Sequence, residues 1–307
     1  MLAAVLATCA LAPFAAEAAD PTEPAPVAGP TAVTIASFNV LGSSHTRHSR
    51  RFATGVERMA NVVRLLERHD VEVVGFQELQ ADQLTSFLTR TAGGYEVYPG
   101  FQLRLMDTDN SIAWDTSQWQ ALEETTVLIP YFDGRQRPMP VVKLRNLQTG
   151  MTAWFANFHN PATNRAHPGQ DGWRAQAIAL EVELAKQLKV TGLPVFFTGD
   201  MNERDEVFCP MTGQAPMRAA RGGTNRNGVC DPGHPWYVDW IFGLKRQPFS
   251  TYVEDAGALV KRTTDHPVIV ADVQIDPVRF PSATTPPVVE PPAPQPPVTI
   301  GRGPWPF

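Results

Sequence analysis

Short apolar runs, separated by polar breaks, recur along the middle of the chain. Around Val33, Ile35 and Phe38 the apolar residues crowd into a β-rich run, which predicts a buried strand that ends at Asn39. Later runs are divided by turn residues such as Asp133-Gly134, which predicts antiparallel pairing. The predicted strands cover residues 32–40, 71–76, 95–98, 112–114, 119–129, 139–147, 151–158, 195–198, 237–242 and 267–275.

Three segments have helical spacing instead. Apolar residues recur every three or four positions in residues 55–68 and 173–189, and less strongly in 81–91, which predicts amphipathic helices. Residues 203–235 are rich in Gly, Asn, Pro and Arg and have no period, so an ordered functional loop is expected there. Helices inserted among strands of mixed pairing predict an α/β sandwich of two sheets.

Composition divides the chain into a globular middle and two unusual ends. It has 307 residues, 43% of them apolar and 19% charged, which is ordinary for a folded protein. Its 29 prolines crowd into both ends. We therefore expect one domain over residues 32–276, a Pro-rich linker over 19–31 and a polyproline-like, disordered tail over 277–307.

Residues 1–18 have the character of a secretory signal peptide. An apolar run precedes Ala16-Glu17-Ala18, which fits the small-x-small cleavage rule, although a basic start is missing. Pro13 interrupts the run, and a spanning helix needs about 20 apolar residues. The sequence predicts a secreted protein without stable membrane insertion, and we expect a monomer.

Two cysteines remain after removal of the signal segment. Cys209 and Cys230 are an even number in an oxidising compartment, which favours a disulfide over two separate buried thiols.

The net charge of −5 argues against an overall basic, nucleic-acid-binding surface. Only residues 45–51, which include Arg47 and Arg50, are locally basic. This loop is either a solvated segment or a cradle for substrate phosphate, and the sequence leaves both interpretations open.

Polar residues that a core would reject follow the predicted buried strands. Ligand sites of α/β folds gather at strand ends, so we expect these residues to converge. They are Asn39, Glu78, His159, Asn160, Asp200, Asn202, Asp265 and His266.

Six segments in order resemble the endonuclease/exonuclease/phosphatase superfamily, which includes deoxyribonuclease I-like enzymes. They are Ser37-Phe38-Asn39-Val40, Gly75-Phe76-Gln77-Glu78, Asn157-Phe158-His159-Asn160-Pro161, Thr198-Gly199-Asp200-Met201-Asn202, Val238-Asp239-Trp240-Ile241-Phe242 and Thr264-Asp265-His266-Pro267-Val268. The resemblance spans residues 33–275. It implies a four-layer sandwich, with two mixed sheets face to face and helices outside, and a divalent-metal-dependent phosphoesterase.

Glu78 is the best candidate metal ligand, because a carboxylate after an apolar strand fits a hard cation. Asn39 either binds the same ion or orients Glu78, and Asp265 is a further candidate ligand. All proposed donors are oxygens and no Cys or His cluster suits zinc, so Mg²⁺ or Mn²⁺ is expected, with Ca²⁺ as an alternative.

The resemblance also implies catalytic roles. Asp200 orients or deprotonates the attacking water, and Asn202 holds a phosphate oxygen; without the family, Asp-x-Asn is more often an Asx turn. His266 contacts the phosphate, with Asp239 fixing its tautomer. His159 is the second phosphate-binding imidazole and a candidate acid for the leaving group.

Residues expected to bind substrate are Asn160, Arg47, Arg50 and Arg226. The family often places a Tyr or Arg of a middle strand near the phosphate, and the sequence leaves open Tyr95, Tyr98, Arg104 or none. For His167 and Trp173, packing is favoured over a place in the pocket.

Substrate class is approached by elimination. An inositol-polyphosphate site needs a dense basic cluster and a lipid site needs an exposed apolar hairpin, and neither is evident in the sequence. A nuclease holds one phosphate at a time, so DNA is the leading substrate. Alternatives are a phosphomonoesterase, a sphingomyelinase-like phospholipid phosphodiesterase and a catalytically silent binding module; the complete set of polar residues disfavours the last.

Overall fold

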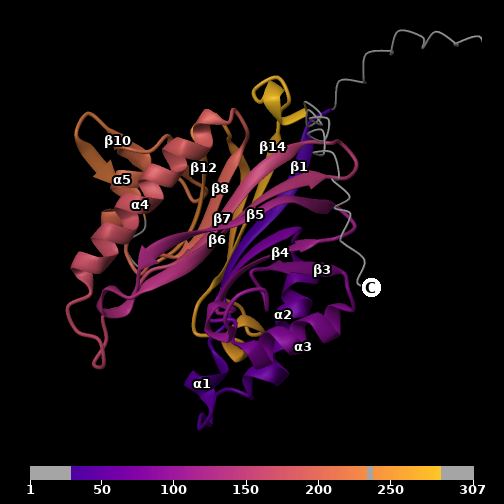
Figure 1. The fold of residues 1–307 in the computed structure, drawn as a ribbon, viewed down its shortest axis with the longest axis vertical. Helices are drawn as coiled ribbons and strands as arrows, with labels where there is room; N and C mark the ends of the chain where they lie inside the picture. The colour runs from indigo at the N-terminus through magenta and orange to yellow at the C-terminus, as the bar shows by residue number, and fades with distance from the viewer. Residues whose placement is uncertain (1–28, 234–237, 285–307) are drawn as a thin grey trace, which may run out of the picture.

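The computed structural model describes residues 29–233 and 238–284 of the chain. Two six-stranded mixed sheets pack face to face, with α2 and α3 beside the first sheet and α4 beside the second (Figure 1). The predicted fold class is therefore confirmed. The predicted signal peptide, most of the linker and most of the tail lie outside the described residues.

The first sheet has the strand order β13-β14-β1-β2-β4-β3, and the second has the order β5-β6-β7-β8-β12-β9. The strands are β1 Thr31–Asn39, β2 Val73–Gln77, β3 Tyr95–Tyr98, β4 Asn110–Asp115, β5 Trp119–Pro130, β6 Gln136–Asn146, β7 Thr152–His159, β8 Val195–Asp200, β9 Met217–Ala219, β10 Thr224–Arg226, β11 Val229–Asp231, β12 Asp239–Leu244, β13 Phe249–Asp255 and β14 Val268–Ile275. The helices are α1 Ser43–Thr46, α2 Gly55–Arg68, α3 Ala81–Thr91, α4 Asp171–Val190 and α5 Asp205–Gly213. Four short 3₁₀ turns cover Leu105–Asp107, Phe132–Gly134, Val260–Arg262 and Pro281–Thr284.

Local sequence signals account for the helices. The predicted bounds of α2 and α3 are those observed. Thr54 begins α2 with a capping box, because its side chain accepts from the Glu57 N–H while Glu57 reaches back to the Thr54 N–H. The apolar face of α2 then packs against β1 and β2.

Strand pairing brings the ends of distant segments together. β1 and β2 run parallel, so Asn39 lies beside Gln77. β7 and β8 are also parallel, and His159 lies beside Asp200. β12 runs antiparallel to β8, so Asp239 is the partner of Asp200.

A buried polar network joins the two sheets just behind these ends. The Asn157 side chain on β7 donates to the Phe76 carbonyl at 2.7 Å and accepts from Gln77 Nε2 at 2.7 Å. Gly75 permits this close approach, because a Cβ there would lie 2.4 Å from Asn157 Oδ1 and 2.0 Å from Thr198 Oγ1. The network fixes β2 against β7 and β8, which both carry site residues.

The segment between β8 and β12 differs from the prediction. Instead of a loop without secondary structure it holds α5, the short strand β9 and the β10–β11 hairpin. Strands of three residues are too short to show alternation, and Pro210 interrupts the pattern of α5. The predicted disulfide is present, since Cys209 on α5 is bonded to Cys230 on β11.

The packed region also continues past the boundary predicted at residue 276. Phe280 and Ala283 are fully buried against the main core. Strand β13, which the sequence did not reveal, borders β14 with a register shift near Phe249 and has largely exposed positions. Within the described part of the chain, every helix is too short or too polar to cross a bilayer.

Candidate active site

Six strand ends from both sheets converge on one polar cluster. Asn39 ends β1 and Glu78 follows β2, His159 ends β7 and Asp200 ends β8, while Asp239 opens β12 and His266 precedes β14. Because the two sheets pack face to face, their strand ends share one edge of the sandwich (Figure 1).

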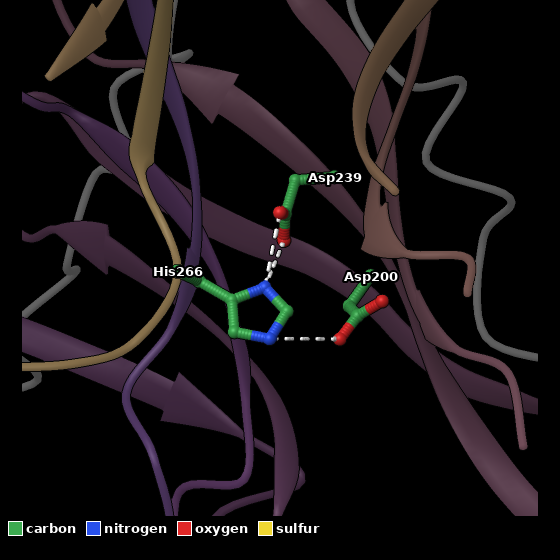
Figure 2. Close-up of side chains that lie close together, drawn as sticks. All are labelled: Asp200, Asp239 and His266. Carbon is green, nitrogen blue, oxygen red and sulfur yellow. Dashed lines mark hydrogen bonds and ion pairs between the residues drawn. The ribbon is translucent and has the colours of Figure 1, made fainter. Parts of the chain in front are cut away.

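His266 and Asp239 form a hydrogen-bonded pair. Nδ1 of His266 lies 3.0 and 3.1 Å from the two Asp239 oxygens, and its Nε2 points toward Asp200 (Figure 2). Burial lowers the pKa of His266, but the charge and hydrogen bond of Asp239 outweigh it and, with the charge of Asp200, raise the pKa to about 10. The imidazole is therefore held as a cation that can donate from Nε2.

Asp200 is the meeting point of the cluster. Its Oδ2 accepts from Asn39 Nδ2 at 3.1 Å and lies 3.6 Å from His159 Nε2 and 3.7 Å from His266 Nε2. Its Oδ1 accepts from the Asn202 N–H at 3.1 Å. Burial raises the pKa of Asp200 to about 7, although the charge of His266 acts in the opposite direction. A carboxylate of this pKa is a suitable proton acceptor near neutral pH.

His159 has the opposite charge state from His266. Its side chain is nearly inaccessible, and burial lowers its pKa to about 3 even though the charge of Glu78 opposes this shift. The ring is therefore neutral. The different environments of the two imidazoles give them different pKa values, so that His266 is cationic and His159 is neutral. Such a difference is typical of sites that separate proton-transfer roles. Tyr131 packs edge-on against His159, with ring centroids 5.7 Å apart.

Glu78 has a separate set of contacts, at the partly open side of the cluster. Oε1 accepts from Asn39 Nδ2 at 3.2 Å, and Oε2 accepts from the Gly42 N–H at 2.9 Å. His45 Nε2 lies 3.5 Å from Oε2. Burial raises the pKa of Glu78, but its interactions with the His159 and His45 imidazoles and its hydrogen bonds from Gly42 and Asn39 outweigh burial, so the net shift is downward. Its backbone φ of 59° is unusual for a non-glycine residue and marks a constrained position.

The donor set fits a hard divalent cation. Glu78 is an ionised carboxylate whose side chain is 21% exposed. The Asp109 carboxylate lies nearby, because it interacts with Arg137 and its pKa is raised in part by the charge of Glu78. Asn39 already uses Oδ1 to accept from the Leu41 N–H, so the structure supports the second of its predicted roles, orientation of Glu78. The oxygens of Asp200 and Asp239 and a nitrogen of His266 also lie within 4.8 Å of one another.

Comparison with known proteins places this geometry in a family. The family model "Endonuclease/Exonuclease/phosphatase family" matches residues 36–266. The chain belongs to the endonuclease/exonuclease/phosphatase family. Its members are metal-dependent hydrolases of phosphate esters, so the predicted enzyme class is confirmed. The curated proteins that were compared contain no significant match.

Solved structures of the family share the fold at low sequence identity. A family protein from Bacteroides vulgatus has 17% identity and a TM-score of 0.63, covering 80% of this chain and 100% of its own. A mannosyl-6-phosphatase from Bacteroides thetaiotaomicron has 16% identity and a TM-score of 0.58, with 78% and 99% covered. TDP2 from D. rerio, complexed with a single-stranded DNA product, has 17% identity and a TM-score of 0.58, with 79% and 99% covered.

Two predicted site residues, Asn160 and Asn202, bind each other at the turn beneath the site. Asn160 is fully buried: its N–H donates to the Asp200 carbonyl at 3.0 Å, and its carbonyl accepts from Asn202 Nδ2 at 2.9 Å. Its side chain lies beneath the site, and the contact with substrate stays a prediction. Asn202, with φ of 50°, braces this turn.

Asp265 lies at the exposed rim of the site. Its charge contributes to the raised pKa of His266, and it forms no hydrogen bond or ion pair with another described residue. Thr264 fixes the turn before it, because its hydroxyl donates to the Asn39 carbonyl at 2.7 Å and accepts from the His266 N–H at 3.3 Å. The structure brings Asp265 near the cluster without showing it as a ligand.

The predicted arginines lie in different places. Arg47 lines a pocket of about 600 Å³ together with Gln80 and Asp109. Gln80 is close to Glu78 in the sequence, and Asp109 is close enough to interact with Glu78 electrostatically. Arg50 is exposed on the same loop. Arg226 lines another pocket with Lys245, beyond the far end of β12 from Asp239, and is not brought to the cluster.

Tyr131 and Arg137, which the sequence did not suggest as middle-strand candidates, lie beside the cluster, with Tyr131 against His159. Arg137 lies 4.6 Å from the centre of the Tyr131 ring and donates to Asp109 at 2.9 Å. The other candidates have structural contacts: the Tyr95 hydroxyl donates to the Val71 carbonyl, Tyr98 is buried in the core, and Arg104 binds Asp107. Tyr131 and Arg137 flank the Asp133-Gly134 turn, and the strand register pairs Arg137 with Ile129, two residues before Tyr131.

His167 and Trp173 pack beside this hairpin, as favoured. The His167 ring stacks on Phe132 at 4.2 Å, its Nδ1 lies 2.9 Å from Asp133, and Trp173 lies against Gly134.

Proposed function

We propose that the protein is a Mg²⁺- or Mn²⁺-dependent phosphodiesterase and that DNA is its substrate. One observation carries this proposal: Asp200 Oδ2 lies within 3.1 to 3.7 Å of Asn39, His159 and His266. A carboxylate shared by two imidazoles of different charge supplies a proton acceptor next to two N–H donors. These are the parts that attack on a phosphate needs.

The residues divide the chemistry between them. Asp200 accepts the proton of the attacking water, and the cationic His266, oriented by Asp239, donates from Nε2 to a phosphate oxygen. His159 is neutral, so it contributes an N–H donor and is not assigned as the acid for the leaving group. Glu78, which Asn39 orients, would hold a divalent ion, and this ion would neutralise phosphate charge when bound.

Support for DNA comes from the surroundings of the site. Arg47 and Arg50 lie on the loop after β1, where they are exposed and available to the flanking backbone. We also propose that the protein is secreted, which the disulfide supports because such bonds persist in oxidising compartments.

A hydrolysis panel tests the assignment. Purified protein should cleave plasmid and oligonucleotide DNA faster than sphingomyelin vesicles, inositol phosphates or a phosphomonoester, and Asp200→Asn should be inert on all of them. Intact DNA alongside release of phosphate from the monoester would assign the protein as a phosphatase.

A phospholipid headgroup ester is the second candidate, and one feature favours it. The turn between β3 and β4 exposes apolar side chains, with Leu105 69% and Met106 63% exposed, next to the Arg47 pocket. No sequence pattern predicted this surface, because these residues follow a strand without a hairpin signal. Leu105→Asp with Met106→Asp should slow hydrolysis of lipid vesicles and spare DNA if lipids are the substrate.

A further inference from the structure

Three connected grooves lie at the end of the second sheet. Their volumes are about 310, 540 and 330 Å³, and Lys245 lines all of them. No Asp or Glu occurs among the described residues that line them. The basic residues that line them are Lys186, Lys189, Arg218, Arg226, Lys245 and Arg246.

Most of these positive charges are uncompensated. Lys189, Arg218, Arg226 and Lys245 are exposed and form no ion pair with a described residue. Lys189 has an alternative role, since a cation near the C-terminus of α4 favours the helix dipole. The other three belong to β9, β10 and the residue after β12, so the dipole does not explain them. In a chain of net charge −5, such a concentration indicates an anionic partner.

The grooves are distant from the catalytic cluster, and both β12 and α4 run from the cluster to the grooves. β12 begins at Asp239 in the site and reaches Lys245 after about 20 Å at strand spacing. α4 gives a similar length, because Arg174 binds the Pro161 carbonyl beside the site and Lys189 lies about 22 Å farther along the helix.

We propose that these grooves are a second contact for DNA, an inference that rests on the proposed function. A duplex carries a phosphate on each strand every 3.4 Å or so, and about six base steps therefore separate the scissile phosphate from the grooves. Three open grooves suit an extended polyanion better than a compact ion. The guanidinium groups of Arg218 and Arg226 suit phosphate oxygens in particular.

Binding measurements on an inert background separate the grooves from catalysis. Asp200→Asn protein serves as parent, and Lys189→Glu with Lys245→Glu removes the groove charge. Arg64→Glu with Arg90→Glu is the matched control, because both arginines are exposed on helices of the first sheet and the net charge changes equally. Fluorescence anisotropy with a duplex of about 20 base pairs and a short duplex of about four base pairs closed by a hairpin loop, at roughly 50 and 200 mM salt, gives affinity and salt dependence.

The groove variant should bind the long duplex at least about tenfold more weakly, with a salt slope lower by about 2, while the short duplex is unaffected. The control should stay within about twofold of the parent, and all thermal transitions should agree. Equal affinity of parent and groove variant for the long duplex would overturn the proposal. So would an acidic polysaccharide that binds through these lysines when DNA does not. If DNA binding depends on the grooves but the wild-type protein cleaves no DNA, the second contact is supported and the proposed function is contradicted.

Discussion

The two ends of β12 have opposite physical character. At Asp239, polar side chains are buried and paired with one another across three strands. At Lys245, the cations are exposed and, apart from Lys186, lack acidic partners among the described residues. Chemistry depends on groups that are desolvated and held in position, whereas capture of a charged polymer depends only on accessible charge.

This contrast predicts different costs of substitution. A buried, hydrogen-bonded group leaves its partners unsatisfied when it is removed, which costs about 1–3 kcal/mol for each partner. Replacement of an exposed Lys usually changes stability by less than about 0.5 kcal/mol. The catalytic end should therefore respond in rate, and the far end in affinity.

Removal of the metal is expected to have the largest effect. The donors near Glu78 are oxygens that suit Mg²⁺ or Mn²⁺, and without an ion the phosphate charge is not neutralised. EDTA should abolish turnover, and excess Mg²⁺ or Mn²⁺ should restore it. Undiminished hydrolysis in EDTA, with added metal making no difference, would contradict the mechanism.

Substitution of Asp200 comes next. Asp200→Asn keeps the shape but removes the proton acceptor, and the rate should fall at least about 100-fold; His266→Ala should fall by a similar factor. The thermal transition should stay near that of the wild type. Asp205→Asn, an exposed aspartate at the start of α5, is the control and should retain full activity. Loss of activity that tracks unfolding would show that these residues are structural.

The sequence anticipated the catalytic end well and the far end poorly. Asn39, Asp200 and His266 were found because each polar residue interrupts or ends an apolar strand, and parallel pairing then brings such ends together. The roles of buried partners were harder to predict. Asn160 belongs to a motif, yet only the packed structure shows that its side chain is fully buried.

Residues that depend on distant contacts escaped prediction. Arg58 on α2 is a charged residue, but it is 1% exposed and donates to the carbonyls of Val40 and Thr263 at 2.6 and 2.5 Å. It thereby joins the loop after β1 to the turn before His266. No local periodicity reveals such a partner, and the same reason hid the short elements around Cys209 and Cys230.

The disulfide should affect stability more than chemistry. Cys209→Ser with Cys230→Ser opens a loop with a sequence separation of 21, for which chain entropy predicts a loss of about 3 kcal/mol. Urea unfolding followed by fluorescence measures this loss. Hydrolysis of a small phosphodiester should persist, because neither cysteine contacts the cluster. If mass spectrometry finds two free thiols in the wild-type protein under non-reducing conditions, the disulfide is absent and the prediction is contradicted.

Glu181 offers the smallest and most specific test, because it is a buried carboxyl that belongs to neither end. It lies on α4, is fully inaccessible, and neither oxygen has a hydrogen-bond partner among the described residues. Burial raises its pKa to about 8, with the nearby Asn160 amide acting weakly in the opposite direction. The folded state therefore keeps Glu181 protonated at pH values where the unfolded chain, with a pKa of 4.5, has released the proton.

The sign of the pH dependence follows from this difference. Below about pH 4.5 both states are protonated and Glu181 does not change stability with pH; between about 4.5 and 8 the unfolded state binds fewer protons, so the free energy of unfolding falls as pH rises. Glu181→Gln should remove that fall. Each pKa unit corresponds to roughly 1.4 kcal/mol, but a buried Gln amide costs about 1–3 kcal/mol itself, so a net gain of about 2 kcal/mol at pH 8 is expected. Urea unfolding at several pH values measures it, with Glu183→Gln on the exposed side of α4 as the control. If the free energies of unfolding of Glu181→Gln and wild type differ by the same amount at every pH in this range, Glu181 has the same pKa in both states. That result would contradict a buried, neutral Glu181 carboxyl.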